Sequence, residues 1–244
     1  MSETSKIRIY VAEDLKPKTS LVLKEEQSHY LCNVMRLKEG DCLRCFNGVS
    51  GEFMAKIKRI HKKQTEIDIG QQIRMFYSCP DIWVLFSPLK KDRTDFLIEK
   101  SVELGVSALI PVITNYGITD KVKTDRLQSQ IIEASEQCER LDIPKLESTR
   151  RLDDILKNWD SNRRLFFLDE RGNGIACKDA FTSLTGDKAA LLIGPEGGFS
   201  NQEAELLYSL PYVTAVSLGP RILRAETACV AALSVWQSIS GDWK

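Results

Sequence analysis

The pattern of apolar and polar positions changes near residue 75, and the two parts of the chain predict different folds. Short stretches with partial alternation, typical of β-strands, lie at 41–46, 51–57 and 65–69. The pair Asn47-Gly48 separates the first two stretches and is a turn signal. One helix is expected near 28–37, and Ser78-Cys79-Pro80 then interrupts the pattern. We therefore predict a small β-rich domain over 1–74.

After Pro80 the chain alternates between strands and helices. Continuous apolar runs, expected of strands buried on both faces, lie at 82–86, 108–113, 165–168, 189–193 and 213–218. Helical spacing is found at 92–104, 124–140, 200–210 and 225–238. Gly105 is a plausible residue to follow the first of these helices. Alternating elements of this kind favour a mainly parallel sheet covered by helices, so we predict an α/β domain over 75–244.

Composition narrows the class of protein. The 244 residues are 43% hydrophobic and 28% charged, as in globular proteins with a proper core. No apolar run approaches the roughly 20 residues of a membrane span, and the first residues lack the apolar segment of a signal peptide. The seven cysteines are few and odd in number, which favours reduced thiols. We expect a cytoplasmic protein.

Charge is balanced overall but unevenly distributed. Residues 1–74 hold 14 basic and 10 acidic side chains, hence +4, and the rest of the chain carries −4. A basic run at 56–63 is suited to neutralising the phosphates of a nucleic acid. A solvated strand end and turn would give the same pattern, so both interpretations stay open. The candidate RNA-binding residues are Arg8, Arg36, Lys56, Lys58, Arg59, Lys62 and Lys63.

Two loops that follow predicted strands have an unusual composition. The first, GPEGG at 194–198, places three glycines around a proline, so its backbone can approach a flat ligand closely. Ser200 and Glu203 then have capping-box spacing, which predicts the start of a helix. The second, GPRILRAET at 219–227, carries two arginines and Glu226. Ligands of parallel α/β sheets bind beyond the carboxyl ends of the strands, so both loops are candidates for a binding site.

Simpler interpretations of these loops exist. Gly-Pro loops are common connectors, and Arg224 with Glu226 could form a surface ion pair worth less than about 1 kcal/mol. Other site types are disfavoured: the chain has no G-x-G-x-x-G, no phosphate-binding P-loop and no G-x-S-x-G motif. Its two histidines, His29 and His61, lie outside the α/β part, which argues against histidine catalysis there.

One pattern resembles a zinc site by spacing. His29 and Cys32 are three residues apart, as are Cys42 and Cys45. However, a gap of three in an alternating strand places Cys42 and Cys45 on opposite faces. We therefore expect core or surface cysteines and no metal.

Several segments of the chain resemble those of a known protein family. The segments LIGPEGGFS (192–200) and SLGPRILRAETA (217–228) resemble the signature loops of the RsmE family of SPOUT-class methyltransferases. Supporting segments are KSVELGV (100–106), EASEQCER (133–140) and HYLCNVMRL (29–37) with Gly40-Asp41. Two departures are visible: Ala225 stands where the family usually has threonine, and Glu139 where it usually has glycine.

The resemblance implies a fold, a reaction and partners. It implies a SPOUT-type α/β domain with a trefoil knot, preceded by a PUA-like β-barrel that contacts RNA. It also implies a homodimer that methylates N3 of a uridine in 16S rRNA with S-adenosyl-L-methionine, and no metal. The expected cofactor-binding residues are Leu168, Ile193, Gly194, Glu196, Gly197, Gly198, Leu218, Gly219, Ile222, Leu223 and Thr227.

Loss of the uridine N3 proton leaves negative charge on the base, and this suggests the catalytic residues. Arg224 is the candidate for stabilising that charge. Glu226 would orient Arg224 or accept the proton. Two rival functions stay open: a non-catalytic ribosome-assembly factor with the same fold, and a methyltransferase for another RNA such as tRNA.

Overall fold

The computed structural model describes residues 6–61, 64–118, 122–184, 186 and 188–243. The chain divides into two compact units: the first comprises Met1–Ser78 and Ser135–Ile143, and the second Cys79–Ala134 and Pro144–Lys244. The boundary near residue 75 stays a prediction. The sequence pattern gave no indication that 135–143 would join the first unit.

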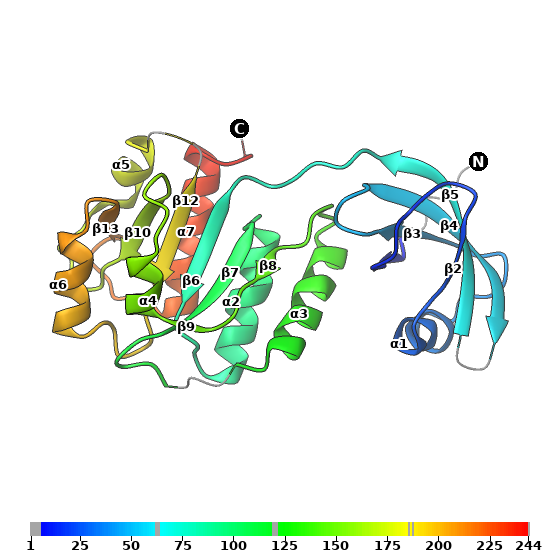
Figure 1. Cartoon of the computed structure of the whole chain (residues 1–244), viewed down its shortest axis with the longest axis horizontal. Coiled ribbons are helices and arrows are strands. Elements are labelled where there is room, and N and C mark those ends of the chain that lie inside the picture. Colours follow the sequence, from blue (N-terminus) through cyan, green and yellow to red (C-terminus); the bar gives the residue numbers. More distant parts are fainter. Residues whose placement is uncertain (1–5, 62–63, 119–121, 185, 187, 244) are drawn as a thin grey trace. The chain divides into compact units, whose positions relative to one another are not determined.

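The first unit is built on a five-stranded sheet in the order β1-β3-β4-β5-β2 (Figure 1). Its strands are β1 (Arg8–Tyr10), β2 (Ser20–Val22), β3 (Cys42–Phe46), β4 (Glu52–His61) and β5 (Gln64–Arg74). β1 runs parallel to β3, and the other pairs are antiparallel. Cys45 is buried and Cys42 exposed, so the two thiols lie on opposite faces of β3 as predicted. The core includes Leu31, Leu43, Ile57 and Ile67.

The helix predicted near 28–37 is shifted and composite. It consists of α1 (Glu25–His29) followed by a π-helix, η1 (Tyr30–Val34). The segment ends early because Arg36 takes a left-handed backbone conformation, with φ of 57°. This reversal lets the Leu37 amide donate to the Leu31 carbonyl at 3.0 Å.

The second unit contains an eight-stranded sheet whose main path is β11-β13-β10-β12-β6-β7-β8, with β9 paired to β7. Every pairing in it is parallel, as predicted. The long strands are β6 (Ile82–Phe86), β7 (Ala108–Ile113), β10 (Arg164–Leu168), β12 (Ala189–Ile193) and β13 (Val213–Ser217). The short ones, which were not predicted, are β8 (Lys145–Leu146), β9 (Arg150–Arg151) and β11 (Ile175–Ala176). Predicted and observed bounds of β6, β7 and β12 agree.

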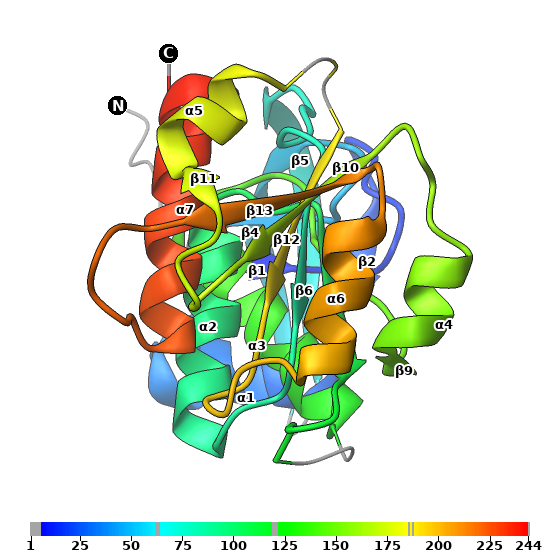
Figure 2. The same cartoon turned by 90° about the vertical axis from the view of Figure 1, so that its left-hand side faces the viewer.

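Helices cover both faces of this sheet. They are α2 (Lys91–Glu103), α3 (Thr124–Gln137), α4 (Leu152–Lys157), α5 (Cys177–Thr182), α6 (Asn201–Ser209) and α7 (Ala225–Ile239). Figure 2 shows α2, α5 and α7 on one face and α4 and α6 on the other. Gly105 follows α2 with φ of 77°, as predicted. In the part of the chain that the structure describes, no helix has the length and apolar character to cross a membrane.

Candidate active site

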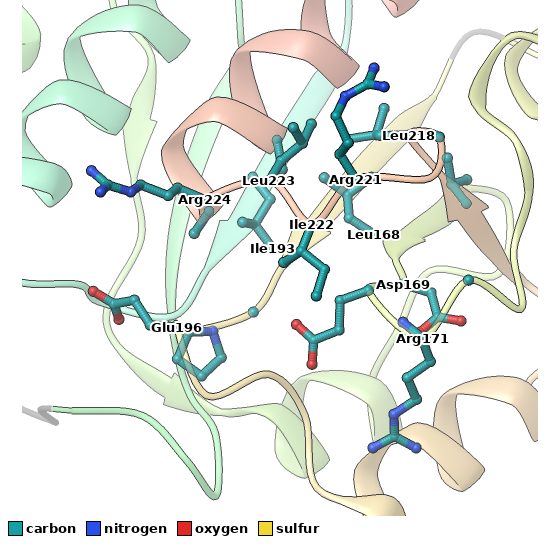
Figure 3. A pocket seen from close by; sticks show the side chains of 18 of the residues that line it. Leu168, Asp169, Arg171, Ile193, Glu196, Leu218, Arg221, Ile222, Leu223 and Arg224 are labelled. Carbon is teal, nitrogen blue, oxygen red and sulfur yellow. The ribbon is translucent and has the colours of Figure 1, made fainter.

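A cavity of about 510 Å³ lies in the second unit at the carboxyl ends of β10, β12 and β13 (Figure 3). These three strands are neighbours in the sheet, in the order β13-β10-β12. The loops that follow them, at 168–172, 193–196 and 218–224, form most of its wall. The position agrees with the general location of ligand sites in parallel α/β sheets.

The structure brings most of the predicted site residues together. The predicted residues that line the cavity are Leu168, Ile193, Gly194, Glu196, Leu218, Gly219, Ile222, Leu223 and Arg224. Gly197, Gly198, Glu226 and Thr227 do not line it. On α7 it is Ala225 and Ala228 that face the cavity, and Thr227 is exposed, which argues against the predicted contact of Thr227 with a ligand. Ala225, the departure from the family pattern, is therefore part of the wall.

Two glycines of the loop at 194–198 are required by packing. A β-carbon on Gly194 would lie 2.7 Å from the Phe199 ring. Gly198 has φ of 69°, and a β-carbon there would lie 1.6 Å from Oε1 of Glu170. The backbone at Gly194 can therefore lie directly against Phe199 while also lining the cavity.

The predicted capping box is present at the start of α6. The Ser200 hydroxyl accepts from the Glu203 amide at 3.2 Å, and the Ser200 amide donates to Glu203 at 2.9 Å. Asn115, after β7, joins both residues: its backbone amide donates to Glu203 at 2.8 Å and its side chain to Ser200 at 2.9 Å. These bonds hold the exit of the glycine loop in one position.

Residues after β10 also form part of the wall, although the sequence analysis singled out only Leu168. The carboxylate of Asp169 is buried and accepts from the Tyr208 hydroxyl at 2.6 Å and from the Arg171 amide at 3.0 Å. The Arg171 guanidinium donates to the Phe199 carbonyl at 2.7 Å. Partial burial raises the pKa of Glu170. Asp169, Glu170 and Arg171 directly follow a predicted strand, and this position alone could have indicated that they belong to the site.

Arg93 is a functional candidate that no motif of the chain indicated. It lies in the first turn of α2 and also lines the cavity. Its Nη1 is 3.1 Å from Oε1 of Glu196, and its Nε is 3.9 Å from Oε1 of Glu226. The other oxygen of Glu226, Oε2, is buried and has no hydrogen-bond partner. One carboxylate oxygen of Glu226, which neighbours the lining residue Ala225 in the chain, is therefore unsatisfied.

Arg224 is positioned by the start of α7. It is the N-cap residue of this helix, with φ of −65° and ψ of 151°, and its side chain makes no capping bond. It is exposed, and in Figure 3 it lies on the same side of the cavity as Glu196, with Arg171 on the other side. Among the described residues it forms no ion pair with Glu226, so the simple surface pair considered above is not present.

The candidate RNA-binding residues of the first unit differ in their surroundings. Arg8 is 5% exposed, donates to Glu52 at 2.6 Å and to the carbonyls of Ser135 and Arg140, and stacks over Phe46. Its guanidinium is not available to a phosphate, so the prediction that Arg8 contacts RNA is wrong. The arginine was chosen for its charge, and the burial comes from partners distant in sequence.

The other candidates lie on the surface or outside the described residues. Arg36, Lys56 and Arg59 are exposed. Lys58 is also exposed but its ammonium contacts Glu66 at 2.6 Å and Asp68 at 3.6 Å, which reduces its net charge toward a ligand. Lys62 and Lys63 lie outside the described residues. Within the described ranges, no group of three His, Cys, Asp or Glu side chains is placed to hold a metal ion.

Comparison with known proteins agrees with this geometry. The family described as RNA methyltransferase domain matches residues 77–237, and the family described as RNA methyltransferase PUA domain matches 23–70. A Rickettsia conorii protein named ribosomal RNA small subunit methyltransferase E is 34% identical over 228 residues, 93% of each chain.

Two solved structures are similar over almost the whole chain. One, from Legionella pneumophila in complex with the bound cofactor SAM, has a TM-score of 0.88 at 33% identity and covers 99% of this chain and 100% of that one. The other is ribosomal RNA small subunit methyltransferase E from Neisseria gonorrhoeae bound to S-adenosyl methionine, with a TM-score of 0.87 at 28% identity and coverage of 98% and 99%.

The fold and the cavity thus define an RNA methyltransferase of the SPOUT type with a PUA-like domain, which confirms the predicted fold class. More narrowly, the chain belongs to the ribosomal RNA small subunit methyltransferase E family, as the loops at 192–200 and 217–228 indicated.

Proposed function

We propose that this chain transfers a methyl group from S-adenosylmethionine to N3 of a uridine in small-subunit ribosomal RNA. The observation that carries the proposal is the cavity where the loops after β10, β12 and β13 meet. The names of the relatives support the RNA class, and the two similar structures support the cofactor. The N3 position rests on the RsmE resemblance.

The cavity suits this cofactor in size and chemistry. Its volume of about 510 Å³ falls within the roughly 300–1,000 Å³ of small-molecule sites. The apolar side chains of Leu168, Ile193 and Leu223 provide surfaces for a flat adenine ring. The carboxylate of Glu170 is suited to a positive charge of the cofactor, on the sulfonium or the amino group, whereas that of Glu196 is already paired with Arg93. When bound, the cofactor supplies a methyl group on a positively charged sulfur, which is an activated donor.

The residues of the chain would then manage the charge on the uracil. Arg224, exposed and without an ion pair to Glu226, is placed to stabilise the negative charge that develops on the base as N3 loses its proton. The unsatisfied Oε2 of Glu226 is the candidate proton acceptor, while Arg93 neutralises the other oxygen. The alternative role of Glu226, orienting Arg224, has no contact to support it.

The proposed partners are the ribosomal RNA and a second copy of the chain. The exposed cations Arg36, Lys56 and Arg59 would contact the phosphates of the rRNA. A second copy of the chain would complete a homodimer, and the 85% exposed side chain of Ile222 at the cavity rim is available to it. Action on ribosomal RNA would place the protein in the cytoplasm.

The test is methyl transfer from labelled S-adenosylmethionine to unmodified 30S subunits, naked 16S rRNA and bulk tRNA, followed by nucleoside mass spectrometry. N3-methyluridine in the ribosomal substrates is the expected result. Methylation of tRNA alone would assign the protein to another RNA. Calorimetry with S-adenosylmethionine separates the remaining rival, because a non-catalytic assembly factor need not bind it.

A further inference from the structure

A second cavity, of about 280 Å³, lies wholly in the first unit between the α1–η1 segment and the ends of β4 and β5. Its volume is just below the roughly 300–1,000 Å³ of small-molecule sites, so it can hold one small group. It is lined by eight residues that the proposed reaction does not use, one of them a carboxylate: Glu25, Ser28, His29, Cys32, Asn33, Ile60, His61 and Thr65.

The floor of this cavity is fixed by internal bonds. Ser28 is 4% exposed and Thr65 is fully buried. The Thr65 amide donates to the Ser28 hydroxyl at 2.9 Å, and the Thr65 hydroxyl lies 3.3 Å from the Cys32 sulfur. These groups are committed to one another, so the floor has a defined shape.

The polar side chains at the rim of the cavity, unlike those of its floor, are free to bind a ligand. His29, Asn33 and His61 are exposed, and among the described residues their side chains make no hydrogen bond. Each imidazole in its neutral form offers one donor and one acceptor, and the asparagine amide offers both. Such paired donors and acceptors around a small cavity match the edge of a nucleobase, and an imidazole also provides a ring for stacking.

Two further features of the same segment favour RNA as the ligand. The rim residues Asn33 and His29 lie on and beside η1, a π-helix, and π-helical turns are rare and occur frequently at functional sites. The same turn exposes Tyr30 and Val34 (37% and 57%), which provide an aromatic and apolar surface for an adjacent base. On β4, the exposed Arg59 lies two residues before His61 and is available to a phosphate.

We propose that this cavity binds one unpaired nucleobase of single-stranded RNA, whose edge is bonded by Asn33 and the two histidines. The inference rests on the proposed function in so far as that function supplies an RNA substrate. It adds a second binding site, separate from the methyl-transfer cavity, that would recognise a nucleotide other than the one modified. Single-stranded segments are the usual targets of base-specific RNA recognition.

The chain offers a direct experiment because His29 and His61 are its two histidines. The full-length protein labelled with ¹³C-histidine should give two Cε1–H signals in NMR spectra. Single-stranded RNA pentanucleotides should shift both signals in a saturable way. An RNA duplex at equal phosphate concentration should shift them little. Equal shifts with the duplex, no shifts at all, or equally tight binding of a free mononucleotide would each overturn the proposal.

Asn33→Ala should weaken pentanucleotide binding by about threefold to tenfold, the effect of losing one hydrogen bond. Asn158→Ala, at an exposed asparagine of the second unit, is the matched control and should leave binding unchanged. The proposed function is tested separately by methyl transfer. If no RNA is methylated but the histidine signals still respond to single strands, the binding site stands alone. If methylation proceeds and the signals do not respond, this inference fails alone.

Discussion

Glu52 in the first unit and Glu226 in the second are carboxylates near arginines, but Glu52 is fully buried and Glu226 only partly, and their surroundings differ. Glu52 is fully buried, and its oxygens lie 2.6 Å from Arg8, 3.3 Å from Arg74 and 3.7 Å from Arg44. Glu226 has one arginine at 3.9 Å, and its second oxygen has no partner. The oxygen of Glu226 that lacks a partner can still accept a proton or a hydrogen bond, whereas the oxygens of Glu52 are both held by arginines, which indicates a structural role.

The structural role of Glu52 is to join segments distant in sequence. Arg8, which it neutralises, also donates to the carbonyls of Ser135 and Arg140 at 2.7 and 2.6 Å. Glu139 in the same segment accepts from Arg44 at 2.6 Å. This network accounts for the membership of 135–143 in the first unit.

Removing the charge of Glu52 should have the largest effect on the stability of the protein. Glu52→Gln leaves Arg8 buried without a counter-charge, and breaking a buried pair in this way costs about 3–5 kcal/mol of unfolding free energy. Urea unfolding monitored by circular dichroism measures the loss. Glu66→Gln, at a more exposed pair with Lys58, is the control and should cost less than about 1 kcal/mol. A loss at Glu52 no greater than the control would refute the structural role.

Replacement of Arg224 should affect catalysis and leave stability nearly unchanged. If Arg224 stabilises the uracil anion, Arg224→Ala should lower kcat by about 10²–10³-fold, as removal of one stabilising donor typically does. Calorimetry should show S-adenosylmethionine affinity within about threefold of the parent, a change below roughly 1 kcal/mol. Arg150→Ala, at an exposed arginine away from the cavity, is the matched control. Equal losses in turnover and in cofactor affinity would contradict the role.

Glu226→Gln tests whether the Glu226 carboxylate accepts the N3 proton. The amide is nearly isosteric but cannot accept the N3 proton as a carboxylate does, so kcat should fall about 10²-fold. Raising the pH should restore part of the rate, because the uridine N3 proton then dissociates without a base. Glu205→Gln, at an exposed position on α6, serves as the control. A rate with no more pH dependence than that of the parent would show that Glu226 is not the base.

The smallest effect is expected at Glu139, at the exposed edge of the Glu52 network. The hydrogen bond from Arg44 lowers the pKa of Glu139. A lowered carboxyl pKa contributes stability above the unfolded value of about 4.3, and this contribution is lost as the pH falls through the folded pKa. Glu139→Gln should therefore cost less than about 1 kcal/mol at pH 7, since the side chain is half exposed, and nothing below the folded pKa. Urea denaturation of the parent and the variant over a series of pH values measures the difference, and a loss that does not shrink as the pH falls would contradict it.

Glu139 stands where the resemblance to the RsmE family leads us to expect glycine, and the backbone conformation there favours glycine. Its φ is 60°, a left-handed conformation that glycine adopts without cost and other residues adopt with strain. In this chain the ion pair with Arg44 offsets the strain, so Glu139→Gly should change stability little in either direction.

Much of the second unit was predictable because its signals are local. The bounds of β6, β7 and β12 follow from apolar runs that are buried on both faces, and the loops at 194–198 and 219–227 follow from their composition. What was missed depends on distant partners. Arg93 reaches the site through Glu196, 103 residues away, and its own helix carries no sign of this. Arg8 was misassigned for the same reason, since its carbonyl partners lie 127 and 132 residues away.

The position of β10 between β12 and β13 has a consequence during synthesis. Both neighbours follow β10 in the chain, and β13 is made last. A nascent chain that has emerged as far as β12 therefore exposes one edge of β10, with its apolar Leu165 and Phe167, to other proteins. The residues that close this edge, 213–217, lead directly into the last loop of the cavity. Pairing of β13 with β10 should therefore protect the nascent chain from aggregation and complete the binding site in the same step, late in translation.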